Sequence, residues 1–169
     1  MTDRDDLEAQ IGRPLRADSD VVARCHLGLP VVADVPPVLD DGTPFPTRFW
    51  LSCPLACTRV GRMEGSGGVR AMERHAAADP DFGARLDAAH IRYAAGRDAK
   101  VPAGTSPMPT GGVAGSRAGV KCLHAHYADH AAGNDNPVGE AVALWVEPLD
   151  CAVPCVVDGA PNPAWREPR

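Results

Sequence analysis

Cysteine and histidine side chains are concentrated in residues 121–130, which read Lys-Cys-Leu-His-Ala-His-Tyr-Ala-Asp-His. If this segment is helical, Cys122, His126 and His130 lie along one face, because residues four apart are neighbours on a helix. Thiolate sulfur and imidazole nitrogen are both ligands that zinc prefers. Three turns are too long for one ion, so we expect Cys122 and His126 to bind it, with His124 replacing His126 if the helix starts late.

A second candidate ligand is Cys53, which lies where a predicted strand ends and a predicted helix begins. Pro54 suits the first helical position and therefore places Cys53 at the N-cap. Unpaired N–H groups and the helix dipole at that position lower the pKa of a thiol. The resulting thiolate is the form required of a metal ligand or a nucleophile. Cys57, one turn later among apolar neighbours, is interpreted as a core residue.

Three more cysteines could complete the site. Cys25 ends a predicted strand beside His26, and the pair Cys151 and Cys155 has a spacing found in zinc half-sites. A metal would also hold the irregular tail in place. We therefore expect zinc bound by Cys53, Cys122 and His126 or His124, completed by Cys25 or by the Cys151/Cys155 pair. A four-cysteine iron–sulfur cluster is the alternative cofactor. The alternative to any metal is that all six cysteines are small core residues.

The glycine-rich segment 111–119 leads into the predicted helix that carries Cys122. Backbone N–H groups in such loops bind phosphate or carboxylate groups, and Arg117 and Lys121 would add positive charge. The segment lacks the Gly-Lys-Ser/Thr ending of a nucleotide-binding P-loop. Its composition alone is more typical of a flexible linker than of an anion site.

Composition narrows the class of protein. The 169 residues are 44% hydrophobic and 23% charged, which is typical of a globular protein rather than a disordered one. The net charge of −5 and the low aromatic content argue against a nucleic-acid partner. No run approaches the roughly 20 apolar residues that a membrane span needs, and the acidic N-terminus is unlike a signal peptide. We expect a cytoplasmic protein with reduced thiols and no membrane association.

The elements that must position these residues indicate an α+β fold in a single domain, residues 1–169. Strands are predicted at 21–25, 30–33 and 48–51, forming a small antiparallel sheet near the N-terminus. Several helices are predicted to pack with it. A long irregular loop covers 101–119. The predicted helices begin or lie at residues 2–11, from 54, and at 69–78, 80–95, 120–132 and 137–146, with a lead-in up to residue 20 and a proline-rich tail over 147–169.

Four segments resemble domain-of-unknown-function family 501, a bacterial family. They are residues 41–47, 51–54, 119–126 and 136–139, and the likeness extends over about residues 21–146. The resemblance implies no reaction. It does favour Cys25, Cys53, Cys122, His124 and His126 as the site. Members are often encoded beside a septum-formation initiator and an exopolyphosphatase-like protein, which implies a protein partner in cell division or the cell envelope.

These observations leave three kinds of function open. A metal closed in by four protein ligands would have a structural or regulatory role, which is the reading the sequence favours. A metal that keeps one position open to water would allow hydrolase chemistry. Without a metal, Cys53 could act as nucleophile, with His124 or His126 as base and the 111–119 loop binding an anion.

Overall fold

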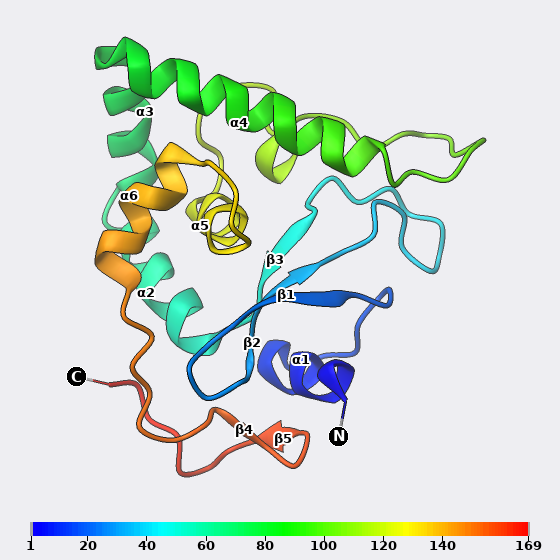
Figure 1. Cartoon of the computed structure of the whole chain (residues 1–169), viewed down its shortest axis with the longest axis vertical. Helices are drawn as coiled ribbons and strands as arrows, with labels where there is room; N and C mark the ends of the chain where they lie inside the picture. Colours follow the sequence, from blue (N-terminus) through cyan, green and yellow to red (C-terminus); the bar gives the residue numbers. More distant parts are fainter. Residues whose placement is uncertain (1, 169) are drawn as a thin grey trace.

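The structure, a computed structural model, describes residues 2–168 and combines helices with a three-stranded and a two-stranded antiparallel sheet (Figure 1). The predicted α+β class is confirmed. The elements in chain order are α1 (Asp3–Ile11), β1 (Asp20–Arg24), β2 (Pro30–Asp34), β3 (Phe49–Leu51), α2 (Pro54–Gly65), α3 (Gly68–Ala78), α4 (Pro80–Asp98), the 3₁₀ turn η1 (Val113–Gly115), α5 (Leu123–Ala131), α6 (Pro137–Val146), β4 (Val156–Val157) and β5 (Ala160–Pro161).

The larger sheet has the order β1-β2-β3, and each strand runs antiparallel to the next. Asp20 pairs with Asp34, and Val32 pairs with Leu51. All five residues of β2 are buried, because the central strand is covered on both faces. Its sequence of proline followed by small and β-branched apolar residues suits that position.

Helix starts follow the residue types at their caps. Thr2 caps α1 in a capping box with Asp5, Asp79 caps α4, and Asn136 caps α6. Proline occupies the first turn of α4, as the sequence predicts from Pro80. These local signals explain why most predicted helices agree with the structure within a few residues.

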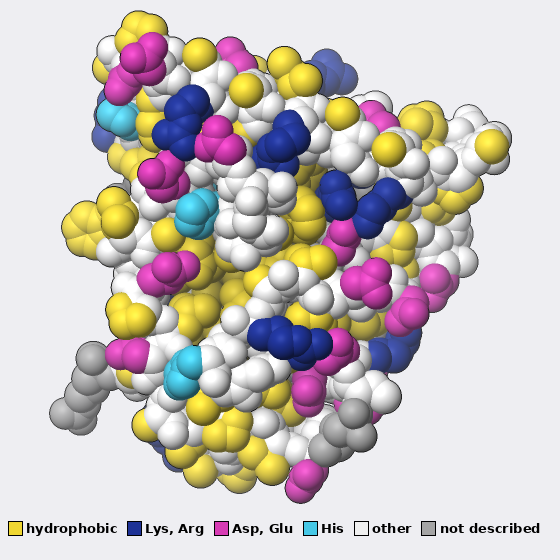
Figure 2. Space-filling model, in the orientation of Figure 1, with side chains coloured by type: hydrophobic (Ala, Val, Ile, Leu, Met, Phe, Trp, Pro, Cys, Tyr) yellow, Lys and Arg dark blue, Asp and Glu magenta, His cyan; other side chains and the backbone are white. Residues whose placement is uncertain are grey.

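Helix α5 lies at the centre of the fold, in contact with β3, α2 and α6 (Figure 1). Leu123 and Tyr127 on α5 are almost fully buried and belong to the main hydrophobic core. On the face shown in Figure 2, acidic and basic side chains are interspersed around a central apolar area. No helix within residues 2–168 combines the length and apolar character needed to cross a bilayer.

Two local predictions differ from the structure. The helix expected over 120–132 begins only at Leu123, because Cys122 is extended (φ −151°) and forms the N-cap. The tail, expected to be irregular, contains the β4–β5 hairpin. Asp158 and Gly159 at its turn have positive φ angles of 54° and 67°. An Asp-Gly pair is a strong signal for such a turn, but strands of two residues are too short to show a hydrophobic period.

The close approach of α6 to α5 depends on Gly139. A Cβ atom there would collide with the backbone oxygen of His126 and with the His130 side chain. We expect Gly139→Ala to lower the free energy of unfolding by about 1–3 kcal/mol, because the two helices must move apart. Urea unfolding followed by circular dichroism measures this change.

Gly61→Ala is the matched control for that substitution. Gly61 is also helical, but a Cβ there meets no atom within 4 Å. We expect this variant to gain about 0.5–1 kcal/mol through helix propensity. Equal effects of the two substitutions would contradict the close helix contact.

Candidate metal centre

Among the residues that the structure describes, one set of metal-binding side chains converges within 4.8 Å: Glu64, Cys122 and His124. Glu64 lies in the last turn of α2, Cys122 is the N-cap of α5, and His124 lies in the first turn of α5. All three side chains are half-buried. The centre therefore forms where the end of one helix meets the start of another.

Glu64 is held in place by the start of α5. Its Oε1 atom accepts a hydrogen bond from the backbone N–H of Leu123 at 2.6 Å. Cys122 makes no side-chain cap of its own, so the carboxylate of Glu64 supplies the missing acceptor. Negative charge is also favoured at a helix N-terminus. The same contact that starts α5 thus brings a carboxylate beside Cys122 and His124.

Both ring nitrogens of His124 have partners. Nε2 lies 3.2 Å from the carbonyl oxygen of Cys57, and Nδ1 lies 3.2 Å from Oε1 of Glu64. A carbonyl can only accept, so Nε2 carries a proton and donates it there. This leaves Nδ1 directed at Glu64. Histidine ligands in metal sites are oriented in this way, with one nitrogen donating to a carbonyl and the other free for the metal.

The electrostatics match this arrangement. A hydrogen bond with Cys122 and the nearby Glu64 carboxylate raise the pKa of His124 to about 9, although burial acts in the opposite direction. In the metal-free protein the imidazole is therefore protonated at neutral pH and paired with Glu64. A cation that replaces the Nδ1 proton would meet the same negative surroundings.

A cavity of about 420 Å³ adjoins the centre. Cys122, His124 and Cys57 contribute to its wall, which also includes Phe49, Trp50 and Leu51 from β3 and residues from the end of α1. This volume lies in the range of small-molecule pockets. The centre therefore has protein on one side and a partly apolar cavity on the other.

The donor set fits zinc. Ligands bound at about 2.0–2.3 Å in a tetrahedron lie roughly 3.3–3.8 Å apart. Nδ1 of His124 and Oε1 of Glu64 are already 3.2 Å apart, and all three donor atoms lie within 4.8 Å of one another. Thiolate, imidazole and carboxylate are all established zinc ligands.

The predicted partnership of Cys122 with His126 is not formed. Cys122 lies before the first turn of α5, so the four-residue stripe along one helix face does not include it. His126 is completely buried, and its Nδ1 donates to Oδ1 of Asn136 at 3.1 Å. Its ring packs edge-on against His90 at 5.6 Å. The structure instead brings Cys122 together with His124, the alternative expected if the helix starts late.

Cys25, Cys53, Cys151 and Cys155 lie outside the set of Glu64, Cys122 and His124. The predicted lowering of the Cys53 pKa is wrong: burial raises it to about 11 and outweighs the backbone N–H groups at the start of α2. A buried thiol with this pKa is a poor nucleophile.

The two basic residues of the predicted anion site lie in different places. Arg117 borders an open depression beside Gly111 and Gly112, whereas the Lys121 ammonium lies 3.4 Å from the carbonyl oxygen of Ala114. Their charges therefore do not converge on one pocket.

Comparison with protein families adds the final observation. Residues 21–144 match the family described as Protein of unknown function (DUF501). The chain belongs to this family. The DUF501 match includes all three residues of the candidate centre, and Cys25 and Cys53 as well, but not Cys151 and Cys155. Comparisons with curated proteins and with solved structures give no match.

Within the DUF501 region, Glu64 is the residue of the centre that the sequence analysis missed. A glutamate in a helical pattern is typical of a solvent-exposed face. The available signal was indirect: α5 begins without a Ser, Thr, Asp or Asn at its N-cap, so an acceptor must come from elsewhere. Its partner Leu123 lies 59 residues away in the sequence.

The buried His126 leads to a prediction about acid stability. Burial lowers its pKa to about 4, and nearby His90 contributes. Protonation therefore favours the unfolded chain, whose histidine pKa is about 6.5. The contribution of neutral His126 to the free energy of unfolding is fully present above pH 6.5. It is lost as the pH falls from 6.5 toward 4, and the loss amounts to up to about 3 kcal/mol.

Urea unfolding of metal-stripped protein between pH 7 and pH 4 measures this loss. A His126→Gln variant should show a smaller loss over the same range, even if it is less stable at pH 7. An equal acid-induced loss in both proteins would contradict the role of His126.

Proposed function

We propose that this protein binds zinc through Glu64, Cys122 and His124, and that the ion keeps its fourth position open toward the adjoining cavity. The observation that supports this most strongly is that two of the three converging donors, Cys122 and His124, line the wall of that cavity. Structural zinc sites are closed by four protein ligands, whereas catalytic sites have three and a bound water. The geometry therefore favours an enzyme of hydrolase type.

Zinc at such a position would lower the pKa of a bound water to about 7 and supply hydroxide near neutral pH. The chain's own residues prepare the site. The Cys57 carbonyl oxygen orients His124, and the Leu123 N–H orients Glu64. Phe49, Trp50 and Leu51 provide an apolar wall that favours a substrate with an apolar part.

Cys57 supports a second candidate function, a closed zinc site with a structural or regulatory role. Cys57 lines the same cavity as Cys122 and His124. Its thiol donates to the carbonyl oxygen of Leu51 at 3.5 Å. Burial, with smaller contributions from Cys53 and Cys122, raises the pKa of Cys57 to about 12. Cys57 is nevertheless not among the donors that converge within 4.8 Å, so the open site is the first candidate.

A cytoplasmic location is part of this proposal. All six cysteines are free thiols, as expected for a reducing compartment. Zinc–thiolate centres with an open position also require reduced cysteine. A protein partner in cell division or the cell envelope is a further proposal, which rests on the gene neighbourhood of the family resemblance alone.

Cobalt substitution tests the open position. We expect metal-stripped protein to bind one Co²⁺ at the centre, and the visible spectrum of that ion to change when a small anion such as azide enters the fourth position. A spectrum that azide leaves unchanged would indicate a closed site. Failure to bind Co²⁺ or Zn²⁺ would overturn the proposal as a whole.

A further inference from the structure

A second group of cysteines converges near the turn between β1 and β2. Cys25 follows β1, and its N–H donates to the carbonyl oxygen of Leu29 at 3.0 Å, which closes the turn. Cys53 comes from the start of α2. Its N–H lies 3.5 Å from the carbonyl oxygen of Val31, two residues after Leu29. Hydrogen bonds thus place both cysteines against the same short hairpin.

The C-terminal tail adds the other two cysteines. The carbonyl oxygen of Cys151 lies 3.1 Å from Nε2 of His26 in the hairpin turn. The amide nitrogen of Gln10 donates both to the carbonyl oxygen of Pro30, at 2.9 Å, and to Sγ of Cys155, at 3.5 Å. Figure 1 shows the tail running below the β1–β2 turn on its way to β4.

Cys53 and Cys155 each have other thiols of this group nearby. Burial, with smaller contributions from Cys155 and Cys25, raises the pKa of Cys53 to about 11. Burial also raises the pKa of Cys155, and Cys25 and Cys151 add to that effect. The four cysteines therefore form one group in space.

Two of these sulfurs accept hydrogen bonds from side-chain N–H groups. Nε1 of Trp165 donates to Sγ of Cys151 at 3.3 Å, and Gln10 donates to Sγ of Cys155. A cysteine that merely fills the core needs no such donor. Thiolate sulfurs that bind a metal carry negative charge, which N–H donors stabilise. Hydrogen bonds to such sulfurs also tune the reduction potential of iron–sulfur clusters.

The spacing distinguishes between types of metal site. Four thiolates on one zinc ion lie about 3.8 Å apart. No three of these four sulfurs lie within 4.8 Å of one another, whereas Glu64, Cys122 and His124 do. In a cluster of four irons each cysteine binds a different iron, so the four sulfurs are held farther apart. The wider group fits a cluster better than a single ion.

We propose that Cys25, Cys53, Cys151 and Cys155 bind a four-iron, four-sulfide cluster, with Trp165 and Gln10 donating hydrogen bonds to two of its thiolate ligands. This site is separate from the zinc centre in residues and in chemistry. It ties the C-terminal tail to the β1–β2 hairpin and to the start of α2.

Anaerobic purification of the full chain, followed by reconstitution with ferrous iron and sulfide, tests the cluster. We expect about four irons and four sulfides per chain with a brown colour. Cys151→Ser should remove most of the iron, whereas the control Cys57→Ser should retain it. Binding of zinc alone by the four thiols, or the absence of iron and sulfide after reconstitution, would overturn the inference.

Two further variants complete the test. One keeps all four cysteines, so that misfolding cannot explain its effect, and the other tests whether the two sites are independent. Trp165→Phe removes one N–H···S hydrogen bond and should keep the iron while lowering the reduction potential, because the bond favours the more negative reduced cluster. An unchanged potential would contradict ligation by Cys151. Glu64→Gln should reduce zinc binding and leave the iron content unchanged. Parallel loss of both metals would contradict two separate sites.

Discussion

Replacing Cys122 by serine is expected to weaken zinc binding by more than about 100-fold. The substitution removes the softest of the three donors, and the loss of an orienting group alone costs 10–100-fold at zinc sites. Cys122 also lies at the N-cap of α5, where serine is a favourable residue, so the fold should be retained. Competition with a chromophoric chelator measures the affinity.

Cys57→Ser is the matched control for Cys122→Ser. Both cysteines are half-buried and line the same cavity, but Cys57 is not among the three converging donors. An open three-ligand centre predicts that zinc affinity changes less than about threefold in Cys57→Ser, which corresponds to less than about 0.7 kcal/mol. Equal losses in the two variants would favour the closed four-ligand site. No loss in Cys122→Ser would exclude the proposed centre.

Asp129→Ala is expected to lower the free energy of unfolding by about 3 kcal/mol, because it leaves buried partners unpaired. Asp129 is fully buried and accepts two hydrogen bonds from Arg92, at 3.2 and 2.6 Å. It also accepts one from Nδ2 of Asn136 at 2.9 Å. Asn136 in turn caps α6 and binds His126, so the loss would extend to both helices.

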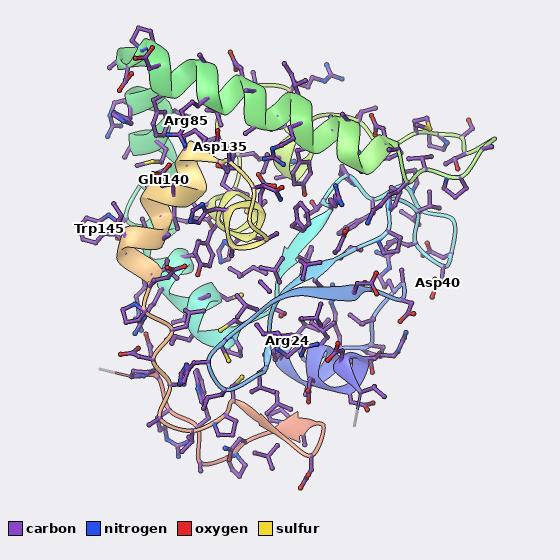
Figure 3. The ribbon with its side chains drawn as sticks, in the orientation of Figure 1. Arg24, Asp40, Arg85, Asp135, Glu140 and Trp145 are labelled. Atoms are coloured by element: carbon purple, nitrogen blue, oxygen red, sulfur yellow. The ribbon has the colours of Figure 1, made fainter. Side chains whose placement is uncertain are left out.

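Asp135→Ala separates this network from an ordinary surface ion pair. Figure 3 shows Asp135 beside Arg85 and Glu140, and Arg85 pairs with both acids. The Asp135 side chain is 66% exposed, so we expect Asp135→Ala to lower the free energy of unfolding by less than about 1 kcal/mol. Urea unfolding at pH 7 compares the two variants. A cost below 1 kcal/mol for Asp129→Ala would show that the buried carboxylate contributes little to stability.

The elements of the fold were largely predictable because their signals are local. Pro80 after Asp79 marks the start of α4, and β-branched runs with the turn at Gly28 indicate the β1–β2 hairpin. The start of α5 was misplaced, because its cap comes from Glu64 on another helix. A contact between residues far apart in the sequence leaves no trace in the pattern around either one.

The candidate site was predictable only as a set of residue types. The spacing of Cys122 and His126 suggested that both lie on one helix face. Because the backbone at Cys122 is extended, its side chain lies near His124 instead. Cys53 was grouped with Cys122, although its backbone is tied to Val31 beside the β1–β2 turn. Sequence spacing identifies donors, whereas their grouping depends on the tertiary path of the chain.

The capping of α5 by Glu64 also sets an order of events during synthesis. A ribosome must release α2, the α3–α4 hairpin and the long loop before the nascent chain contains all three ligands of the proposed zinc centre. The four-cysteine group can assemble only later, once Cys155 has also been synthesised. The ligand sets of the two proposed sites would therefore become complete at different stages of synthesis.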